Sequence, residues 1–364
     1  MSDVLVVGGG IMGLLTAREM HMAGAEVTLI ERNPSPAQES SWAGGGIISP
    51  LYPWRYADSI TRLAVIGHRT YPALCEQLRE DTGIDPEYRR SGLFIHAKEE
   101  QEQALRWAGQ WDYRLSVEDS VSIAKREPAR RNPPNQLLWM PDIGQVRNPR
   151  LVKALVRDLQ QRGVKIHTTF PATEFDIENG SITQVKTPST GFRAEKIILC
   201  TGAWTGRLSQ ALPAAPDIHP VRGQMLLFKT RPGLIRHMML EENRYIIPRR
   251  DGHVLFGSTL EEKGFEKITT SEARKELEKL ATDRFPALAD CPVVAHWAGL
   301  RPASPAGIPY VCRHPQLQNL YINAGHYRNG VVLAPASTRL ICELVTGTEP
   351  SIDPSPYTLD APRG

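Results

Sequence analysis

A glycine-rich segment near the start of the sequence contains residue types that could hold a dinucleotide. Gly8-Gly9-Gly10-Ile11-Met12-Gly13 is a GxGxxG motif. In this motif Gly8 would allow a tight turn, Gly10 would let the backbone approach a pyrophosphate, and Gly13 would let a helix pack against a strand. Glu31 follows eighteen residues after Gly13 and could accept hydrogen bonds from a ribose. These residues predict a site for a nucleotide cofactor.

The elements that must position this motif are also visible in the sequence. Residues 3–7 form a short apolar run rich in β-branched residues, which is typical of a strand buried on both faces. Residues 14–23 have helical spacing, and Gly24 is suited to end that helix. Residues 26–30 form a second strand that leads to Glu31. A glycine-rich turn alone would explain the motif, but the complete strand–helix–strand unit favours a dinucleotide fold.

The segment that follows Glu31 favours FAD over NAD. Residues 40–48 read Ser-Ser-Trp-Ala-Gly-Gly-Gly-Ile-Ile, a stretch of mostly small residues. Such backbone could lie flat against a large planar ligand. A flexible surface loop is the alternative, yet the position directly after the second strand favours one wall of a flavin site.

Length, composition and charge exclude several classes of protein. The chain has 364 residues, enough for about two domains. Its 43 Lys and Arg against 40 Asp and Glu leave a net charge of +3, too small to argue for nucleic acid. No apolar run approaches the ~20 residues of a membrane span, and the N-terminus does not resemble a secretory signal. The five cysteines are scattered without a CxxC pair, so we expect a cytoplasmic protein with reduced thiols and no metal site.

Three later stretches again show the strand and helix patterns that are typical of a nucleotide-binding domain. Residues 148–167 predict a helix, with Asn148 as its N-cap, followed by a strand. Residues 196–204 predict a buried strand that ends in a tight turn at Gly202, where ligands of open α/β sheets bind. Residues 319–343 predict a strand, a glycine-bounded turn and a helix, a geometry that directs backbone N–H groups toward a ligand.

The intervening segments differ in pattern and predict a second, inserted domain. Residues 224–229, 245–248 and 254–258 alternate with a period near two, and Asp251-Gly252 is a hairpin signal. We therefore predict an α/β protein in which an inserted, largely antiparallel α+β substrate domain joins a doubly wound, Rossmann-like FAD-binding domain. The FAD-binding domain would comprise residues 1–82, 148–215 and 297–364, and the substrate domain residues 83–147 and 216–296.

Two further segments are predicted to lie at the surface. The basic residues Lys125, Arg126, Arg130 and Arg131 fit a solvated face. The proline-containing tail from Glu349 fits a surface extension.

Six stretches of the chain together resemble a known family, the FAD-dependent D-amino-acid oxidase superfamily, and within it the bacterial glycine oxidases of thiamine biosynthesis. They occur in family order and span residues 4 to about 345, the last two being the most specific. The stretches are 6–13, 41–48, 220–224 (Pro-Val-Arg-Gly-Gln), 245–249 (Tyr-Ile-Ile-Pro-Arg), 297–302 (Trp-Ala-Gly-Leu-Arg-Pro) and 325–336, which begins Gly-His-Tyr-Arg-Asn-Gly.

The resemblance implies roles for individual residues. Arg301 would bind a substrate carboxylate, Tyr245 would hydrogen-bond to it, and Arg328 would border the same pocket. A planar guanidinium suits this task because it can hold a carboxylate at two points and so fix the adjacent C–H bond. Further residues would contact FAD: Gly8, Gly10, Ile11, Met12, Gly13, Glu31, Arg32, Glu39, Ser40, Gly44, Gly45, Gly46, Ala172, Gly202, His326, Tyr327, Arg328, Asn329, Gly330, Val331 and Val332.

Two positions depart from a known glycine oxidase, and we expect both to affect the pocket. Asn243 stands where that enzyme has a histidine, and Gly46 stands where it has a methionine. The surroundings of Cys312 do not resemble a flavin attachment site, so noncovalent FAD is expected.

The implied reaction is oxidative deamination of glycine. Hydride would pass to flavin N5, the imine would yield glyoxylate and ammonia, and oxygen would become hydrogen peroxide. This hydride transfer needs no general base from the protein, and none is predicted. The imine could also be handed to the machinery that builds the thiazole of thiamine, and a homo-oligomer is expected.

Alternative functions remain open from the sequence. One is an oxidase or dehydrogenase for sarcosine, proline or a small D-amino acid, with oxygen or another acceptor. Others are a flavin-binding subunit without turnover and an NAD dehydrogenase.

Overall fold

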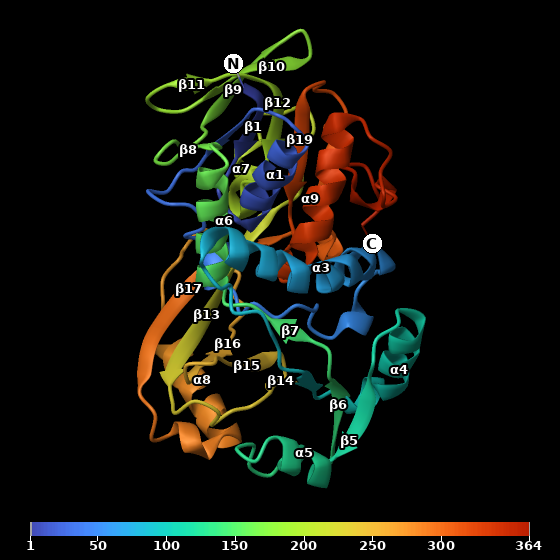
Figure 1. The fold of residues 1–364 in the computed structure, drawn as a ribbon, viewed down its shortest axis with the longest axis vertical. Helices are drawn as coiled ribbons and strands as arrows, with labels where there is room; N and C mark the ends of the chain where they lie inside the picture. The colour runs from blue at the N-terminus through green and yellow to red at the C-terminus, as the bar shows by residue number, and fades with distance from the viewer. Residues whose placement is uncertain (1, 364) are drawn as a thin grey trace.

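A computed structural model describes residues 2–363, which form two large β-sheets placed one above the other (Figure 1). The upper sheet has six strands in the order β18-β19-β12-β1-β2-β8. Five of its strands pair in parallel: β1 (Ser2–Val7), β2 (Val27–Ile30), β8 (Lys165–His167), β12 (Ala194–Leu199) and β19 (Leu320–Ala324). β18 (Tyr310–Arg313) is antiparallel to β19. The predicted parallel sheet with its βαβ start is therefore present.

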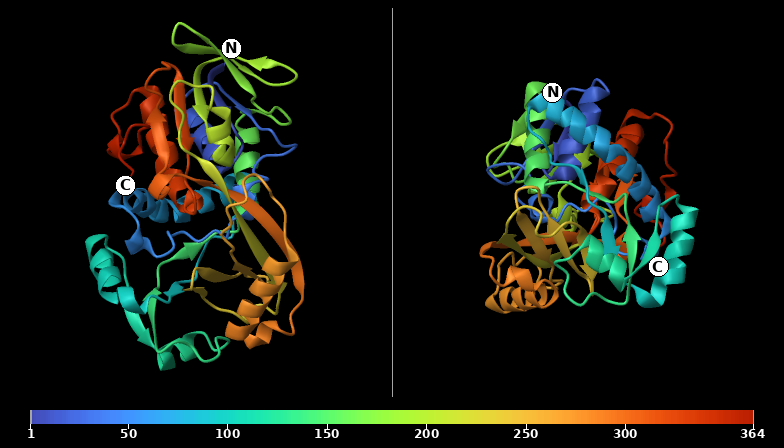
Figure 2. Two further views of the ribbon diagram at one scale, coloured as in Figure 1. Left: turned by 180° about the vertical axis from the view of Figure 1, so that it is seen from behind. Right: turned by 60° about the horizontal axis from the view of Figure 1, so that its bottom comes forward.

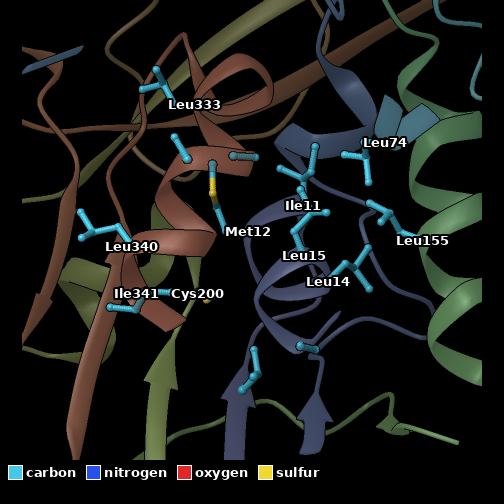
Figure 3. Packing of buried hydrophobic residues seen from close by; sticks show 14 of the residues in the cluster. Ile11, Met12, Leu14, Leu15, Leu74, Leu155, Cys200, Leu333, Leu340 and Ile341 are labelled. Carbon is cyan, nitrogen blue, oxygen red and sulfur yellow. The ribbon is translucent and has the colours of Figure 1, made fainter. Parts of the chain in front are cut away.

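Alternation along β1 explains why both faces of the upper sheet are covered. Val4 and Val6 pack against the helices, whereas Leu5 and Val7 belong to a separate cluster on the other face. The helical face carries α1 (Ile11–Met22), α3 (Asp58–Thr82), α6 (Asn148–Gln161) and α9 (Gly330–Thr346). Figure 3 shows the apolar side chains of α1 between those of the neighbouring helices.

The second face carries a small antiparallel sheet, and Leu208 of the short helix α7 (Thr205–Leu208) also packs there. The strands of this sheet are β9 (Glu174–Glu178), β10 (Ser181–Lys186) and β11 (Gly191–Phe192). Ile182 and Val185 of β10 are buried against Leu5 and Val7. Both faces of the parallel strands are thus protected from water, as such strands require.

The lower sheet has eight strands in the order β17-β13-β16-β15-β14-β4-β6-β5. All neighbours are antiparallel except β14 and β4. The strands are β4 (Leu93–Ile95), β5 (Ser116–Asp119), β6 (Gln136–Met140), β13 (His219–Lys229), β14 (Met238–Glu241), β15 (Arg244–Pro248), β16 (His253–Gly257) and β17 (Val293–Ala303). This is the largely antiparallel sheet that the period-two stretches predict.

Helices cover both faces of the lower sheet. α8 (Ser271–Arg284) and α5 (Ser120–Arg126) contribute to one apolar cluster, and α4 (Gln101–Gln110) contributes to the other. The long strands β13 and β17 extend from the lower body toward the upper one, as the left view of Figure 2 shows. The predicted boundary between residues 296 and 297 falls within β17, which is one continuous strand. The five predicted domain segments therefore stay a proposal. The shorter elements are α2 (Ser40–Ala43), α7 (Thr205–Leu208), β3 (Arg89–Arg90) and β7 (Gly144–Gln145).

Three local expectations need correction. Arg130 is buried in an ion pair with Glu241, with N–O distances of 2.8 and 2.9 Å, so this part of the basic stretch is not a solvated face. Asn148 makes no capping bond in α6; its side-chain amide donates to the carbonyl oxygen of Ser41. The tail is not a simple surface extension, because Tyr357 is fully buried and its hydroxyl donates to the carbonyl oxygen of Ser59.

We expect truncation of Tyr357 to destabilise the upper body. Tyr357→Ala should lower the free energy of unfolding by about 3–5 kcal/mol, because it leaves a cavity against α3. Tyr357→Phe should cost only about 1 kcal/mol, the contribution of one hydrogen bond. Guanidinium chloride unfolding of both variants measures the difference, and an unchanged midpoint for Tyr357→Ala would show that the tail does not belong to the core.

Candidate active site

A cavity of about 590 Å³ lies at the carboxyl ends of β1, β12 and β19 and continues to β13, β15 and β17. This edge of a parallel sheet is where ligands of α/β folds bind. All of the predicted site residues except Gly13 line it. They are Gly8, Gly10, Ile11, Met12, Glu31, Arg32, Glu39, Ser40, Gly44, Gly45, Gly46, Ala172, Gly202, Tyr245, Arg301, His326, Tyr327, Arg328, Asn329, Gly330, Val331 and Val332.

Gly13 acts through packing. A Cβ atom added there would lie 1.8 Å from the carbonyl oxygen of Gly8, which itself has a φ of +106°. Only glycine at both positions allows the turn and the helix to approach this closely. The N-terminus of α1 therefore faces the cavity, and the hydroxyl of Ser41 accepts a hydrogen bond from the amide of Ile11 at 2.8 Å.

Glu31 lies at the end of β2 with 6 % of its surface exposed. Its carboxylate accepts hydrogen bonds from the amides of Gly9 at 2.7 Å and Asn33 at 2.8 Å. Burial raises the pKa of this carboxyl, and the two amide hydrogen bonds oppose that shift. The amides fix the orientation of the carboxylate beside the glycine-rich turn.

At the other end of the cavity, Arg301 is held by neutral oxygen atoms. Its Nη2 donates to the hydroxyl of Ser258 at 2.6 Å, and its Nη1 donates to the carbonyl oxygen of Thr259 at 3.3 Å. The Tyr245 hydroxyl donates to the same Ser258 oxygen at 3.2 Å. The structure thus brings Arg301 and Tyr245 together as expected, and Ser258 joins them.

Neither Arg301 nor Arg328 forms an ion pair with any carboxylate among residues 2–363. Burial lowers the pKa of the Arg301 guanidinium, and the nearby charge of Arg328 lowers it further. Guanidinium groups nevertheless remain charged at any physiological pH. This end of the cavity therefore favours an anion.

Sequence reasoning missed the residues that make room for Arg301 and hold it. Gly223 of β13 is paired with Gly299 of β17, and a Cβ at Gly223 would lie 2.1 Å from Nη1 of Arg301. Ser258 and Thr259 follow β16 directly. The family-like stretch 220–224 includes Gly223, but nothing local in the sequence shows that a guanidinium crosses it.

A second arginine, Arg249, fixes the glycine segment of the cavity wall. It donates to the carbonyl oxygens of Gly45 and Val146, both at 2.8 Å, and to the side chain of Gln145 at 2.7 Å. Burial lowers the pKa of Arg249 to about 10. It acts as a structural clamp that the sequence alone did not assign.

Gly46 and Asn243 contribute to the pocket differently from expectation. A Cβ at Gly46 would lie 2.1 Å from the carbonyl oxygen of Val146. Glycine is therefore required here because the backbones of residues 46 and 146 lie close together, and the side that a larger residue would clash with is not the open cavity. Asn243 does not line the cavity; its backbone N–H donates to the Tyr52 hydroxyl at 3.4 Å.

The turn after β19 supplies buried polar groups. His326 bonds through Nε2 to the hydroxyl of Ser337 at 3.0 Å, and burial lowers its pKa to about 3, so the ring is neutral. The side-chain amide of Asn329 is buried at the cavity wall without a hydrogen-bond partner in the described chain. An unpaired buried amide is costly, so this side chain favours a polar group of a ligand at the cavity wall.

Residues 2–363 contain no group of three or more His, Cys, Asp or Glu side chains that could hold a metal ion. Cys312 is buried outside the cavity lining, and burial raises the pKa of its thiol to about 12. Within the same described range, every helix is too short or too polar to cross a membrane.

Comparisons with known proteins agree with this geometry. The family model described as FAD dependent oxidoreductase (DAO) matches residues 3–344. A glycine oxidase of Pseudomonas aeruginosa is 44 % identical over 362 residues, covering 99 % of this chain and 98 % of the relative. The crystal structure of glycine oxidase from Geobacillus kaustophilus superposes with a TM-score of 0.92 at 26 % identity, covering 100 % and 99 % of the two chains.

A third relative is a longer protein. The bifunctional protein ThiO/ThiG of Synechocystis is 29 % identical over 349 residues. The match covers 94 % of this chain but only 51 % of that protein.

We expect acid to destabilise the protein through His326. The unfolded chain binds a proton near pH 6.5, whereas the folded ring with a pKa of about 3 does not. The stability is therefore complete above pH 6.5 and falls as the pH decreases. Between pH 7.5 and pH 5 this group should cost about 2 kcal/mol. Urea unfolding across that range should show a shallower pH dependence for His326→Asn than for the wild type; equal slopes would contradict the assignment.

We also expect Gly223→Ala to displace the Arg301 guanidinium. The new Cβ would overlap Nη1, so affinity for a small carboxylate such as glycolate should fall about tenfold or more through loss of a charged hydrogen bond. Calorimetric titration with glycolate measures this change. Gly109→Ala is the matched control, because Gly109 lies in α4 with no atom within 4 Å of the added Cβ; equal affinities of the two variants would exclude a steric role for Gly223.

Proposed function

We propose, from the premise that this chain belongs to the family of FAD-dependent oxidoreductases, that it oxidises glycine to the imine and reduces oxygen to hydrogen peroxide. The single observation that carries the proposal is the Arg301 guanidinium, which has no carboxylate partner in the described chain and borders the cavity beside Tyr245. The 44 % identity to a glycine oxidase over nearly the whole length supports glycine as the substrate.

The residues present fit FAD, the cofactor of the family. The helix N-terminus at Gly10 suits a pyrophosphate, and Glu31 suits the adenosine ribose. The unpaired amide of Asn329 offers hydrogen bonds to a polar ring edge at the other end. We propose that the cavity-lining residues named above, with Gly13 behind them, hold FAD without a covalent bond.

In this proposal the chain's own residues orient the substrate. Arg301 binds the glycine carboxylate at two points. When the carboxylate is bound, the Tyr245 hydroxyl turns its single hydrogen from Ser258 to the carboxylate, and the Ser258 hydroxyl can donate to the Tyr245 oxygen instead. Ser258 keeps these two groups in register through its hydroxyl. Arg328 borders the same pocket. When bound, FAD supplies the two-electron acceptor for the α-hydrogen, so the protein contributes binding and orientation.

No side chain of the pocket is assigned as a general base. His326 is neutral, and its Nε2 is engaged with Ser337. The reacting amine must therefore lose its proton before oxidation. The rate should rise with pH as the bound ammonium deprotonates.

The fate of the product is a further part of the proposal. Free imine would hydrolyse to glyoxylate and ammonia. The joining of a similar chain to a second unit in the ThiO/ThiG protein supports transfer of the imine to machinery that builds the thiazole of thiamine. We also propose a cytoplasmic location and a homo-oligomer.

Anaerobic titration with glycine, followed by air, tests the function. Glycine should bleach the visible flavin band, and air should restore it. A yellow protein that glycine does not bleach would reject glycine as the substrate and favour sarcosine, proline or a small D-amino acid.

Substitution of the carboxylate-binding residues should separate substrate binding from cofactor binding. Arg301→Ala should raise the KM for glycine about 100-fold or more, because two charge-assisted hydrogen bonds are lost. Tyr245→Phe should raise it about tenfold, the equivalent of 1–2 kcal/mol for one hydrogen bond to a charged group. Both variants should retain bound flavin in absorbance spectra, and a normal KM for Arg301→Ala would refute its role.

A further inference from the structure

Ser258 and Thr259, the two residues that hold Arg301, belong to a segment that is hydrogen-bonded to β13. After β16 ends at Gly257, the chain continues beside β13. The amide of Gln224 donates to the Thr259 hydroxyl at 2.8 Å. The backbones of Arg222 and Glu261 exchange two hydrogen bonds, at 2.9 and 3.0 Å. Residues 258–261 thus extend the lower sheet up to the cavity.

The side chain of Glu261 joins the parts of this extension. Its Oε2 accepts from the Arg222 guanidinium at 2.6 and 3.1 Å. Its Oε1 accepts from the side-chain amide of Gln224 at 2.9 Å. The Thr259 hydroxyl also donates to Oε1. Burial raises the pKa of the Glu261 carboxyl, but these hydrogen bonds outweigh it and hold the pKa below the ordinary value. Glu261 is therefore ionised at neutral pH.

Arg222 and Glu261 face away from the substrate pocket. Side chains alternate along a strand, so Arg222 and Gln224 lie on the face of β13 opposite Gly223, whose position the Arg301 guanidinium crosses. Glu261 does not line the cavity, whereas Ser258 does. Glu261 therefore acts on substrate binding indirectly. The shortest connection runs from the Thr259 hydroxyl to the Thr259 carbonyl oxygen and Ser258, which contact Arg301.

We propose that Glu261 is a positioning residue for the substrate carboxylate. Its ionised side chain fixes residues 258–261 on β13, and this segment presents the Ser258 hydroxyl and the Thr259 carbonyl oxygen to Arg301. The identity of the bound carboxylate as that of glycine rests on the proposed function. The positioning itself requires only that Arg301 bind a carboxylate.

The test compares carboxylate affinity in the FAD-loaded protein, without turnover. Glycolate has the carboxylate of glycine and a hydroxyl in place of its amine, and its binding can be followed through the visible flavin spectrum. Glu261→Gln keeps the side-chain size but places an amide against the donors. The Kd for glycolate and the KM for glycine should each rise about tenfold, with kcat at saturating glycine within about twofold, since the loss lies in carboxylate binding.

Asp158→Asn provides the matched control. Asp158 is a buried carboxylate that accepts from Arg18 at 3.1 Å and Arg162 at 2.9 Å, with no contact to the Arg301 network. This variant should lower the Tm while leaving the Kd for glycolate unchanged. Thr259→Val is a second probe, because it removes the hydroxyl between Glu261 and Gln224 and retains the branched shape; about a threefold rise in Kd is expected from one weakened hydrogen bond.

The outcomes separate the two proposals. Raised Kd values for Glu261→Gln and Thr259→Val, with an unchanged value for Asp158→Asn, support positioning. A folded, FAD-loaded Glu261→Gln protein with wild-type Kd overturns it, as does an equal rise for Asp158→Asn. If Glu261→Gln does not fold, Thr259→Val alone decides. A wild type that binds glycolate but is not reduced by glycine rejects the proposed function and leaves the Glu261 result valid.

Discussion

The structure of the site depends on holding one guanidinium group, that of Arg301, without a carboxylate partner. A charge removed from water is stabilised either by an opposite charge or by oriented dipoles. Here a hydroxyl and a carbonyl oxygen, from Ser258 and Thr259, provide the dipoles. An internal carboxylate would occupy the guanidinium and exclude a ligand, whereas neutral acceptors leave its remaining donors free. In the proposed function, selectivity for a small anion comes from the charge that the protein leaves uncompensated.

This requirement explains the unusual junction of β13 and β17. The guanidinium can cross β13 only because Gly223 lacks a side chain, and the paired Gly299 allows close contact with Ala43 of α2. The indole of Trp297 donates to the carbonyl oxygen of Ala43 at 3.1 Å. The two long strands therefore bring the wall of the nucleotide cavity and the anion-binding group into one rigid unit, which hydride transfer requires.

The two ends of the cavity carry different charged residues. Glu31 lies at the glycine-rich turn, held by backbone amides, with Arg32 and Glu39 near it, while Arg301 and Arg328 lie at the far end. Between them the wall is made of backbone fixed by Arg249 and of uncharged side chains such as His326. A long ligand with a ribose at one end and a reactive ring at the other would fit this order. A small anion would be held only beside the ring.

Much of the fold could be predicted because its signals are local. The apolar run before Gly8, the glycines of the turn and the alternation in residues 245–258 each depend on a few consecutive residues, and all appear in the structure as expected. Arg301 and Tyr245 were assigned because a family resemblance places them, and the structure brings them together through Ser258. Sequence reasoning failed where a contact joins distant residues.

Tertiary structure alone decided the contacts of Gly223, Ser258 and Glu261, because each meets a partner tens of residues away. The same reason explains the errors for Arg130, whose partner is Glu241, and for Tyr357, whose hydroxyl reaches Ser59. A basic or proline-rich stretch has the composition of a surface segment, and only the packed chain shows which of its side chains find a buried partner. Local periodicity specifies elements, whereas the burial and pairing of charges are properties of the assembled sheets.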